Sequence, residues 1–153
     1  MSKKDATDVL PLDNHLCFSI YGANLALQRT YKPVLDRLGI TYPQYLALSL
    51  LWERDQRTVG EMARELDLEA STMTPLLKRL ESTGFIRRTR HPDNDRQVVI
   101  LLTPKGKRAR TTARCLIEAL QENSELSLAQ INEFNGKVKA FRNALREALE
   151  GGD

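Results

Sequence analysis

The sequence contains few cysteines, few aromatic residues and no long apolar run. Its 153 residues include two cysteines, two histidines and one tryptophan. Two cysteines are too few for the disulfide framework of a small secreted domain, so we expect free thiols in a reducing compartment. The cysteines and histidines have no paired ligand spacing beyond His15-x-Cys17, so we expect no metal and no other cofactor.

The sequence also lacks a recognisable targeting segment. The polar residues 1–5 are not followed by the apolar core of a signal peptide. No stretch approaches the roughly 20 apolar residues that cross a bilayer. We therefore expect a cytoplasmic protein that makes no contact with a membrane.

The composition is that of one globular domain. Hydrophobic residues make up 41% and charged residues 28% of the chain, and the net charge is only +3. These values are ordinary for a single-domain protein of this length. We expect one domain over residues 1–153, mainly α-helical with a small β-hairpin, which is an α+β organisation. Its central unit would span residues 42–103, between helices at 12–40 and 105–150.

Two short segments of the central unit have the same apolar spacing. Apolar residues recur at i, i+3, i+4 and i+7 in both, the pattern of a helix with one buried stripe. They are Val59, Met62, Ala63 and Leu66 in the first segment and Met73, Leu76, Leu77 and Leu80 in the second. Residues 67–69 form a three-residue turn between them. This layout predicts a helix-turn-helix.

The second helix has side chains suited to double-stranded DNA on its outer face. Ser71, Thr72 and Thr74 lie near its start, where a recognition helix meets base edges. Lys78 and Arg79 follow and are predicted to contact phosphates. Residue 75 is a proline, which a helix tolerates in its first turn because amides there lack an intrahelical partner.

A basic hairpin is predicted directly after Gly84. Residues 85–90 form the outgoing strand, 91–95 are rich in turn formers, and 96–102 return. Eight Lys or Arg and only two Asp lie between positions 87 and 110, a local surplus of six, which suits backbone phosphates. The hairpin would be the wing of a winged helix-turn-helix, although a charged hairpin exposed only to water is the alternative.

Individual side chains of the hairpin have separate predicted roles. Arg87, Arg88 and Arg90 would hold phosphates. Arg96 would enter the minor groove, with Asp95 orienting it through an ion pair.

The flanking segments are predicted to be helices that pair two copies of the chain. Helical spacing runs over residues 14–38, ended by Gly39, and over 42–54, 105–121 and 127–149. Long helices at both ends have no obvious partner within the chain. We therefore expect a homodimer, whose two-fold symmetry also matches that of a pseudo-palindromic operator.

Cys17 is the second notable feature. Asp13 or Asn14 is a natural N-cap, which places Cys17 in the first turn of a helix. Unpaired amides and the positive end of the helix dipole favour a thiolate there, and a protonated His15 would add to this effect. Free cysteine is more often a small buried hydrophobic residue, and position alone favours that reading over a reactive thiolate.

Several short motifs resemble one regulator family over residues 12–149. The motifs are residues 12–18 (LDNHLCF), 31–33 (YKP), 41–45 (TYPQY), 74–81 (TPLLKRLE) and 93–96 (DNDR). The chain resembles a MarR-type regulator, and its first half resembles the organic hydroperoxide-sensing (OhrR) branch. The resemblance implies a DNA-binding repressor, not an enzyme, in which an organic hydroperoxide oxidises Cys17 and the operator is released. It also implies that Tyr31 and Tyr42 of the partner subunit hold the Cys17 thiol, although Tyr31 also continues an apolar helix face.

Cys115 fits the resemblance less well. Branch members with two cysteines carry a resolving cysteine that would fall near residues 121–124 of this chain. About 10 Å of helical rise separates Cys115 from that position, and a disulfide needs Cα atoms within about 7 Å. Cys115 is therefore either a resolving thiol reached by helix movement or a packing residue.

Other functions remain as alternatives to the redox sensor. The nearest is a MarR-like regulator that is released by a phenolic or aromatic ligand without redox chemistry. A thiol peroxidase based on Cys17 lacks an accompanying catalytic constellation, and a non-specific architectural DNA binder is a further alternative.

Overall fold

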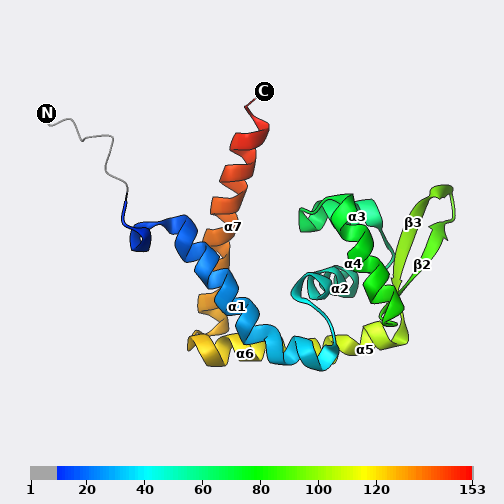
Figure 1. Cartoon of the computed structure of the whole chain (residues 1–153), viewed down its shortest axis with the longest axis horizontal. Helices are drawn as coiled ribbons and strands as arrows, with labels where there is room; N and C mark the ends of the chain where they lie inside the picture. The colour runs from blue at the N-terminus through cyan, green and yellow to red at the C-terminus, as the bar shows by residue number, and fades with distance from the viewer. Residues whose placement is uncertain (1–9, 153) are drawn as a thin grey trace, which may run out of the picture.

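The computed structural model describes residues 10–152. In order, its elements are η1 (Leu12–Asn14), α1 (Leu16–Leu38), α2 (Tyr42–Glu53), β1 (Arg57–Thr58), α3 (Val59–Leu66), α4 (Ala70–Ser82), β2 (Ile86–His91), β3 (Asn94–Leu102), α5 (Pro104–Ala113), α6 (Cys115–Ser124) and α7 (Leu128–Glu150). The fold is mainly helical with one small antiparallel sheet, as the sequence predicted (Figure 1).

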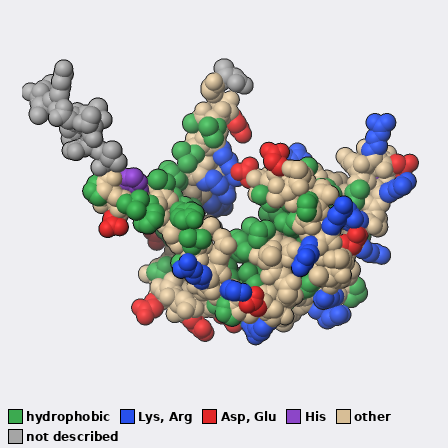
Figure 2. Space-filling view, viewed as in Figure 1, with side chains coloured by type: hydrophobic (Ala, Val, Ile, Leu, Met, Phe, Trp, Pro, Cys, Tyr) green, Lys and Arg blue, Asp and Glu red, His purple; other side chains and the backbone are tan. Residues whose placement is uncertain are grey.

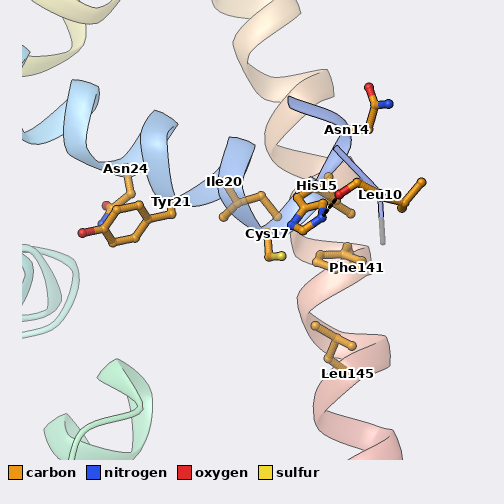
Figure 3. Close-up of a pocket in the computed structure, with 10 residues that line it drawn as sticks. Leu10, Asn14, His15, Cys17, Ile20, Tyr21, Asn24, Phe141 and Leu145 are labelled. Atoms are coloured by element: carbon orange, nitrogen blue, oxygen red, sulfur yellow. Dashed lines mark hydrogen bonds between the residues drawn. The ribbon is translucent and has the colours of Figure 1, made fainter. Parts of the chain in front are cut away.

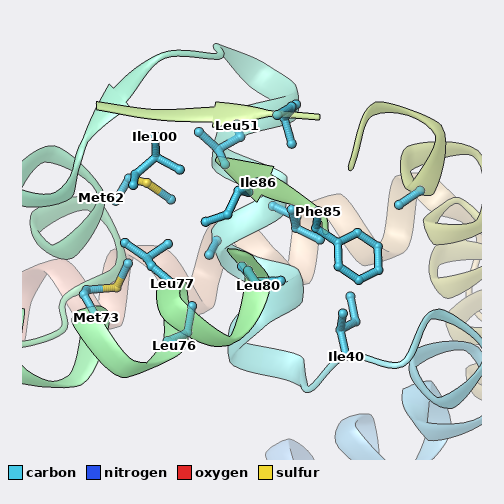
Figure 4. Packing of buried hydrophobic residues seen from close by; sticks show 14 of the residues in the cluster. Ile40, Leu51, Met62, Met73, Leu76, Leu77, Leu80, Phe85, Ile86 and Ile100 are labelled. Carbon is cyan, nitrogen blue, oxygen red and sulfur yellow. The ribbon is translucent and has the colours of Figure 1, made fainter. Parts of the chain in front are cut away.

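The core lies where α2, α3 and α4 meet the sheet. These four parts supply most of the deeply buried large side chains, and α6 adds one: Leu48, Leu51, Met62, Met73, Leu77, Leu80, Ile86, Ile100 and Leu116. Figure 4 shows Met62, Leu77 and Ile100 converging from a helix, the next helix and a strand. The apolar stripes of residues 59–66 and 73–80 therefore face the core, as their spacing predicted, except that Val59 and Leu66 are only partly buried.

Local signals fix most helix ends. Thr58 caps α3 with its hydroxyl, which accepts from the Glu61 amide, while the Glu61 carboxylate accepts from the Thr58 amide. Asp67 ends α3 in the left-handed region, at φ 56°, and Gly39 ends α1 at φ 70°. The turn between α3 and α4 has the three predicted residues, 67–69.

The sheet has a strand that the sequence did not predict. The strand order is β1-β3-β2, and Arg57 and Thr58 of β1 pair with Ile100 and Val99 of β3. The hairpin strands are near the predicted positions, but β3 begins at Asn94 rather than at residue 96. The hairpin turn is therefore shorter than expected.

Three predicted helix details were wrong. The helix expected over residues 105–121 is divided into α5 and α6 at Arg114. The N-cap of α1 is His15, not Asp13 or Asn14, and the His15 side chain makes no capping hydrogen bond. Pro75 is the sixth residue of α4 because the helix begins at Ala70, so the proline lies beyond the first turn.

The flanking helices expose long apolar faces. None of the 23 residues of α7 is buried, and Phe134, Val138, Phe141 and Leu145 are all exposed. Leu16, Phe18 and Tyr21 at the start of α1 are exposed as well. No helix in the described range 10–152 has the length and apolar character to cross a membrane.

Candidate nucleic-acid interface and thiol site

The predicted recognition helix, α4, presents its polar side chains to solvent. Its buried stripe is Met73, Leu76, Leu77 and Leu80. The predicted DNA-contacting residues lie on the opposite, exposed side of α4: Ser71, Thr72, Thr74, Lys78 and Arg79. The sequence therefore separates a packing face from a face that is free to enter a groove.

Thr74 and Pro75 give this face an unusual local chemistry. The Thr74 hydroxyl donates to the Ala70 carbonyl at 3.0 Å, so its oxygen offers a DNA base lone pairs rather than a proton. Pro75 has no amide proton for the Ser71 carbonyl, four residues earlier. The exposed face of α4 is consequently richer in acceptors than its residue types suggested.

The hairpin arginines are not equivalent. The Arg88 guanidinium donates to Glu81 of α4, at 2.9 Å from Nη2 and 3.2 Å from Nε. These bonds hold the pKa of the Glu81 carboxyl below its usual range. Arg87 and Arg90 are exposed and, within residues 10–152, neither forms an ion pair. Part of the charge of Arg88 is therefore already matched.

The predicted ion pair between Asp95 and Arg96 was wrong. Both residues lie in β3, where consecutive side chains point to opposite faces of the strand, and they make no ion pair with each other. The same alternation places Arg96 on the face that Val98 and Ile100 share. Near the hairpin tip the Arg96 amide instead donates to the Asn94 side chain at 3.1 Å.

The basic segment 87–110 does not form one surface. Figure 2 shows basic side chains both on the hairpin and along the lower edge of the molecule, over α5. Lys105 is fixed at the hairpin base, where its Nζ donates to the Thr83 carbonyl at 2.6 Å and lies 4.4 Å from the Phe85 ring centroid. The sequence pattern could not reveal this division because the two halves separate only in the folded chain.

Cys17 is the second residue of α1 and its thiol is exposed. It lines an open hollow of about 890 Å³ between the start of α1 and the second half of α7. Figure 3 shows Ile20, Phe141 and Leu145 around its sulfur, and the His15 ring beside it. His15 Nε2 donates to the Leu10 carbonyl at 2.7 Å, so this nitrogen carries the proton. The first-turn position of Cys17 is confirmed, and its thiol is not buried by the rest of its own chain.

Sequence reasoning did not identify Phe141 and Leu145 as neighbours of Cys17. They were recognised only as apolar positions of a C-terminal helix. Their four-residue spacing gives a shared face but not the element that the face meets.

Tyr31 and Tyr42 lie together, with ring centroids 6.0 Å apart. Burial and the neighbouring Tyr42 and Tyr45 raise the pKa of Tyr31 to about 12, and burial also raises the pKa of Tyr42. Both phenols therefore stay protonated and can donate hydrogen bonds. Cys17 lies fourteen residues before Tyr31 on the same helix, a rise of about 21 Å, so the two do not meet within one chain.

Cys115 is the first residue of α6 and is partly buried against the core. Both thiols are free in this structure. Among residues 10–152, no group of three or more His, Cys, Asp or Glu side chains is arranged to hold a metal ion.

The fold and this interface define a winged helix-turn-helix transcriptional regulator. A sequence model of the MarR family matches residues 40–98. The chain is 48% identical over 99 residues to the organic hydroperoxide resistance transcriptional regulator of Bacillus subtilis (strain 168), covering 65% of this chain and 67% of that protein. It is 44% identical over 145 residues to the regulator TtmR of Methylorubrum extorquens (strain PA1), covering 95% and 74%. The chain belongs to the MarR family.

Solved structures give the same assignment. The structure of reduced AbfR bound to DNA, a protein of Staphylococcus epidermidis, matches with a TM-score of 0.75 and 34% identity over 90% of this chain and 94% of that one. AbfR has also been solved overoxidised on DNA and in a disulfide form. The disulfide form matches less closely, with a TM-score of 0.62 and 35% identity over 91% and 92% of the two chains.

Proposed function

We propose that this protein is a homodimeric repressor that senses organic hydroperoxides through Cys17 and then releases its operator. The observation that carries the proposal is an exposed first-turn thiol inside an apolar hollow, at the position where the OhrR motif places the sensing cysteine. The similarity to a hydroperoxide resistance regulator and to a protein solved in reduced and oxidised forms supports it.

The DNA-binding part of the proposal uses two copies of α4. MarR-family regulators bind DNA as dimers, and the exposed apolar faces of α1 and α7 are available to pair two chains. Two recognition helices would then enter successive major grooves about 34 Å apart, with the hairpins beside the flanking minor grooves. Ser71, Thr72 and Thr74 would meet bases, and the basic side chains around them would contact phosphates. These are Lys78, Arg79, Arg87, Arg88 and Arg90, while Arg96 would enter the minor groove.

The redox step needs only the thiolate and the peroxide. The Cys17 sulfur attacks the terminal oxygen of ROOH, the O–O bond breaks, and the sulfur becomes a sulfenic acid after a two-electron oxidation. The alkoxide takes up a proton and leaves as the alcohol ROH. Leu16, Ile20 and Phe141 line the hollow and would favour an alkyl or aryl R group over hydrogen peroxide.

Release would follow from loss of hydrogen bonds between the two chains. The protonated phenols of Tyr31 and Tyr42 in the partner would donate to the Cys17 thiolate and lose these bonds on oxidation. Two hydrogen bonds to a charged group contribute about 3–6 kcal/mol. Shifting the protein from 99% operator-bound to 99% released takes about 5.5 kcal/mol. The lost hydrogen bonds reach this value only at the top of their range, so we expect a second covalent step at the sulfenic acid to contribute.

The decisive experiment replaces Cys17 with serine. The C17S variant should bind the operator as tightly as the natural chain and should stay bound when cumene hydroperoxide is added. Release that persists in C17S would refute the sensor. A C115S variant is the matched control, because it also removes one thiol but leaves Cys17 in place.

The role of Cys115 is read from the same samples on non-reducing gels. A peroxide-induced dimer band in the natural chain that disappears in C115S means a disulfide between subunits. If both proteins release DNA without such a band, Cys115 is a packing residue, and the sulfenic acid on Cys17 would be capped by a small cellular thiol or oxidised further.

One observation favours the ligand-controlled alternative. A hollow of about 570 Å³ between α1, α6 and α7 has apolar walls that include Leu27, Phe134 and Val138, and Tyr31 also lines it. An aromatic ligand of modest size would fit this volume. Release of DNA by salicylate under reducing conditions, in natural protein and C17S alike, would establish this alternative.

A further inference from the structure

Helix α5 has a basic face that the DNA-binding arrangement does not use. Lys107 and Arg110 of α5 and Arg114, the residue that caps its C-terminal end, follow one another at i, i+3 and i+7. The backbone of Arg114 is still helical, so the three side chains lie on one side. All three are exposed, and α5 contains no acidic residue. Within the described part of the chain none of the three forms an ion pair. We call these three side chains the α5 basic face.

The α5 basic face lies at the wrong end of the DNA-binding unit for the operator. The Thr103 hydroxyl bonds to the Gly84 carbonyl and accepts from the Gly106 amide, which joins the start of α5 to the end of α4. The start of α4, with its base-reading residues, is one helix length away, about 20 Å for 13 residues. The hairpin tip also points away from α5 (Figure 1). A duplex held by α4 and the hairpin would leave this face open to solvent.

A hollow beside this face combines positive charge with an apolar floor. It measures about 300 Å³ and lies between α2, the end of β3 and α5. Its lining consists of Leu51, Trp52, Asp55, Leu102, Lys107 and Arg110. Trp52 is held in place because its indole nitrogen donates to the Gly106 carbonyl at 2.9 Å. One carboxylate oxygen of Asp55 already accepts from the amides of Gln56 and Leu102, both at 2.9 Å.

We infer that this face is a docking site for an acidic amphipathic segment of a partner protein. Carboxylates at i, i+3 and i+7 of a partner helix span about 10 Å, the same rise that separates Lys107 from Arg114. An apolar side chain between them would enter the hollow over Trp52 and Leu102. Charge complementarity at the rim and apolar contact at the centre are the two features of a protein interface.

The same geometry disfavours a nucleic acid. A phosphate strand could pair with the rim cations but would leave the apolar floor formed by Trp52 and Leu102 unused. Because the site lies away from α4, a docked partner and the operator can be bound together. The inference does not depend on Cys17, so it can fail or succeed independently of the redox proposal.

Trp52 makes the site directly measurable, since it is the only tryptophan in the chain. The probe is a helical peptide with Glu at i, i+3 and i+7 and Phe between them, titrated into the full-length reduced protein. We expect a saturable change in Trp52 fluorescence that weakens with added salt. A peptide with Lys in place of each Glu should produce no saturable change.

Two variants of the same helix locate the contact. Arg110→Glu should lower the affinity for the acidic peptide about tenfold, because electrostatic attraction becomes repulsion at the rim. Arg108→Glu is the matched control: it makes the same change of charge on α5 but lies outside the basic face, so its effect should be less than about twofold. Circular dichroism and operator binding, unchanged in both variants, show that each is folded.

Three results would overturn the inference. One is the absence of a saturable Trp52 response to the acidic peptide in natural protein. Another is equal weakening by Arg108→Glu and Arg110→Glu, which means non-specific attraction. The third is a random-sequence duplex that quenches Trp52 more strongly than the peptide and does so through Arg110, which would make the occupant a nucleic acid.

Discussion

Arg146, near the end of α7, donates a hydrogen bond from Nη2 to the carboxylate of Asp67 at 2.8 Å. Asp67 is the left-handed residue that ends α3 and opens the turn into α4. The contact therefore joins the C-terminal helix to the turn that sets the position of the recognition helix. Both side chains remain substantially exposed, so the pair is an ordinary surface ion pair in energetic terms.

This pair predicts a small but measurable coupling. Asp67→Asn removes the charge while keeping a side chain that tolerates the left-handed backbone. Together with Arg146→Gln and the double variant it forms a double-mutant cycle in urea unfolding. We expect a coupling free energy of about 0.2–1 kcal/mol that falls with added salt. A coupling of zero at low salt would mean that the contact does not form in solution.

Gly106 predicts a large loss of stability on substitution. A Cβ at this position would lie only 2.1 Å from the Phe85 carbonyl oxygen, which is backbone and cannot turn away. Gly106→Ala should therefore move α5 off the hairpin and lower the free energy of unfolding by about 1–3 kcal/mol or more. Gly60→Ala is the control, because nothing lies within 4 Å of its Cβ position and a helix gains from alanine. Chemical denaturation that ranks Gly106→Ala as no worse than Gly60→Ala would contradict this packing.

The exposed face of α4 predicts two different losses of DNA binding. Lys78→Ala and Arg79→Ala should each lower the binding affinity for all DNA sequences alike. Each should also reduce the slope of log K against log salt by about one. Ser71→Ala should instead reduce discrimination between the operator and a mismatched site, by up to about 1–3 kcal/mol per base contact. Fluorescence anisotropy with both duplexes at several salt concentrations separates the two effects. An unchanged salt slope in both basic variants would remove them from the interface.

The ion pair between Glu81 and Arg88 predicts which hairpin arginine contributes more to DNA affinity. Because Glu81 already matches part of the Arg88 charge, Arg88→Ala should cost less affinity than Arg90→Ala in the same salt titration. Glu81→Gln should then raise affinity for any duplex. If Arg88→Ala is the more damaging change, Arg88 must exchange Glu81 for a phosphate on binding.

Tyr31 predicts a stability change at high pH. Its pKa is raised from 10.0 to about 12 in the folded chain, so folding favours the protonated phenol. The stabilisation is complete below pH 10 and is lost as the pH rises from 10 towards 12. Tyr31→Phe should reduce that decline and remove the highest-pH step of the phenolate absorbance, while Tyr42, whose pKa is also raised, keeps part of the decline. The exposed Tyr21→Phe should change neither. A decline that is the same in both variants would assign it to other groups.

How much the sequence could predict depended on the range of the interaction. The apolar spacing of Met62, Met73 and Leu77 located two helices and the core, because one buried stripe is a property of a single helix. Strand β1 was missed since its two residues exist as a strand only through pairing with Val99 and Ile100, some forty residues later. The helix break at Arg114 has no glycine or proline to signal it.

The site shows the same limit. Exposure of Ser71 and Lys78 followed from their place opposite the buried stripe. The Asp95–Arg96 pair failed because adjacent strand residues point apart. The proposed contact between Cys17 and Tyr31 of another subunit cannot be derived from one chain, where about 21 Å of α1 separates the two residues.

The exposed apolar face of α7 makes the stability of this helix depend on protein concentration. None of its 23 residues is buried, so this helix gains little packing energy from its own chain, and a single chain exposes Phe134, Val138 and Phe141 to water. A newly synthesised chain therefore exposes an apolar surface that promotes association until a second copy covers it. On dilution we expect α7 to unfold before the core formed by α2, α3, α4 and the sheet. Exchange of subunits would then begin at the C-terminal helix.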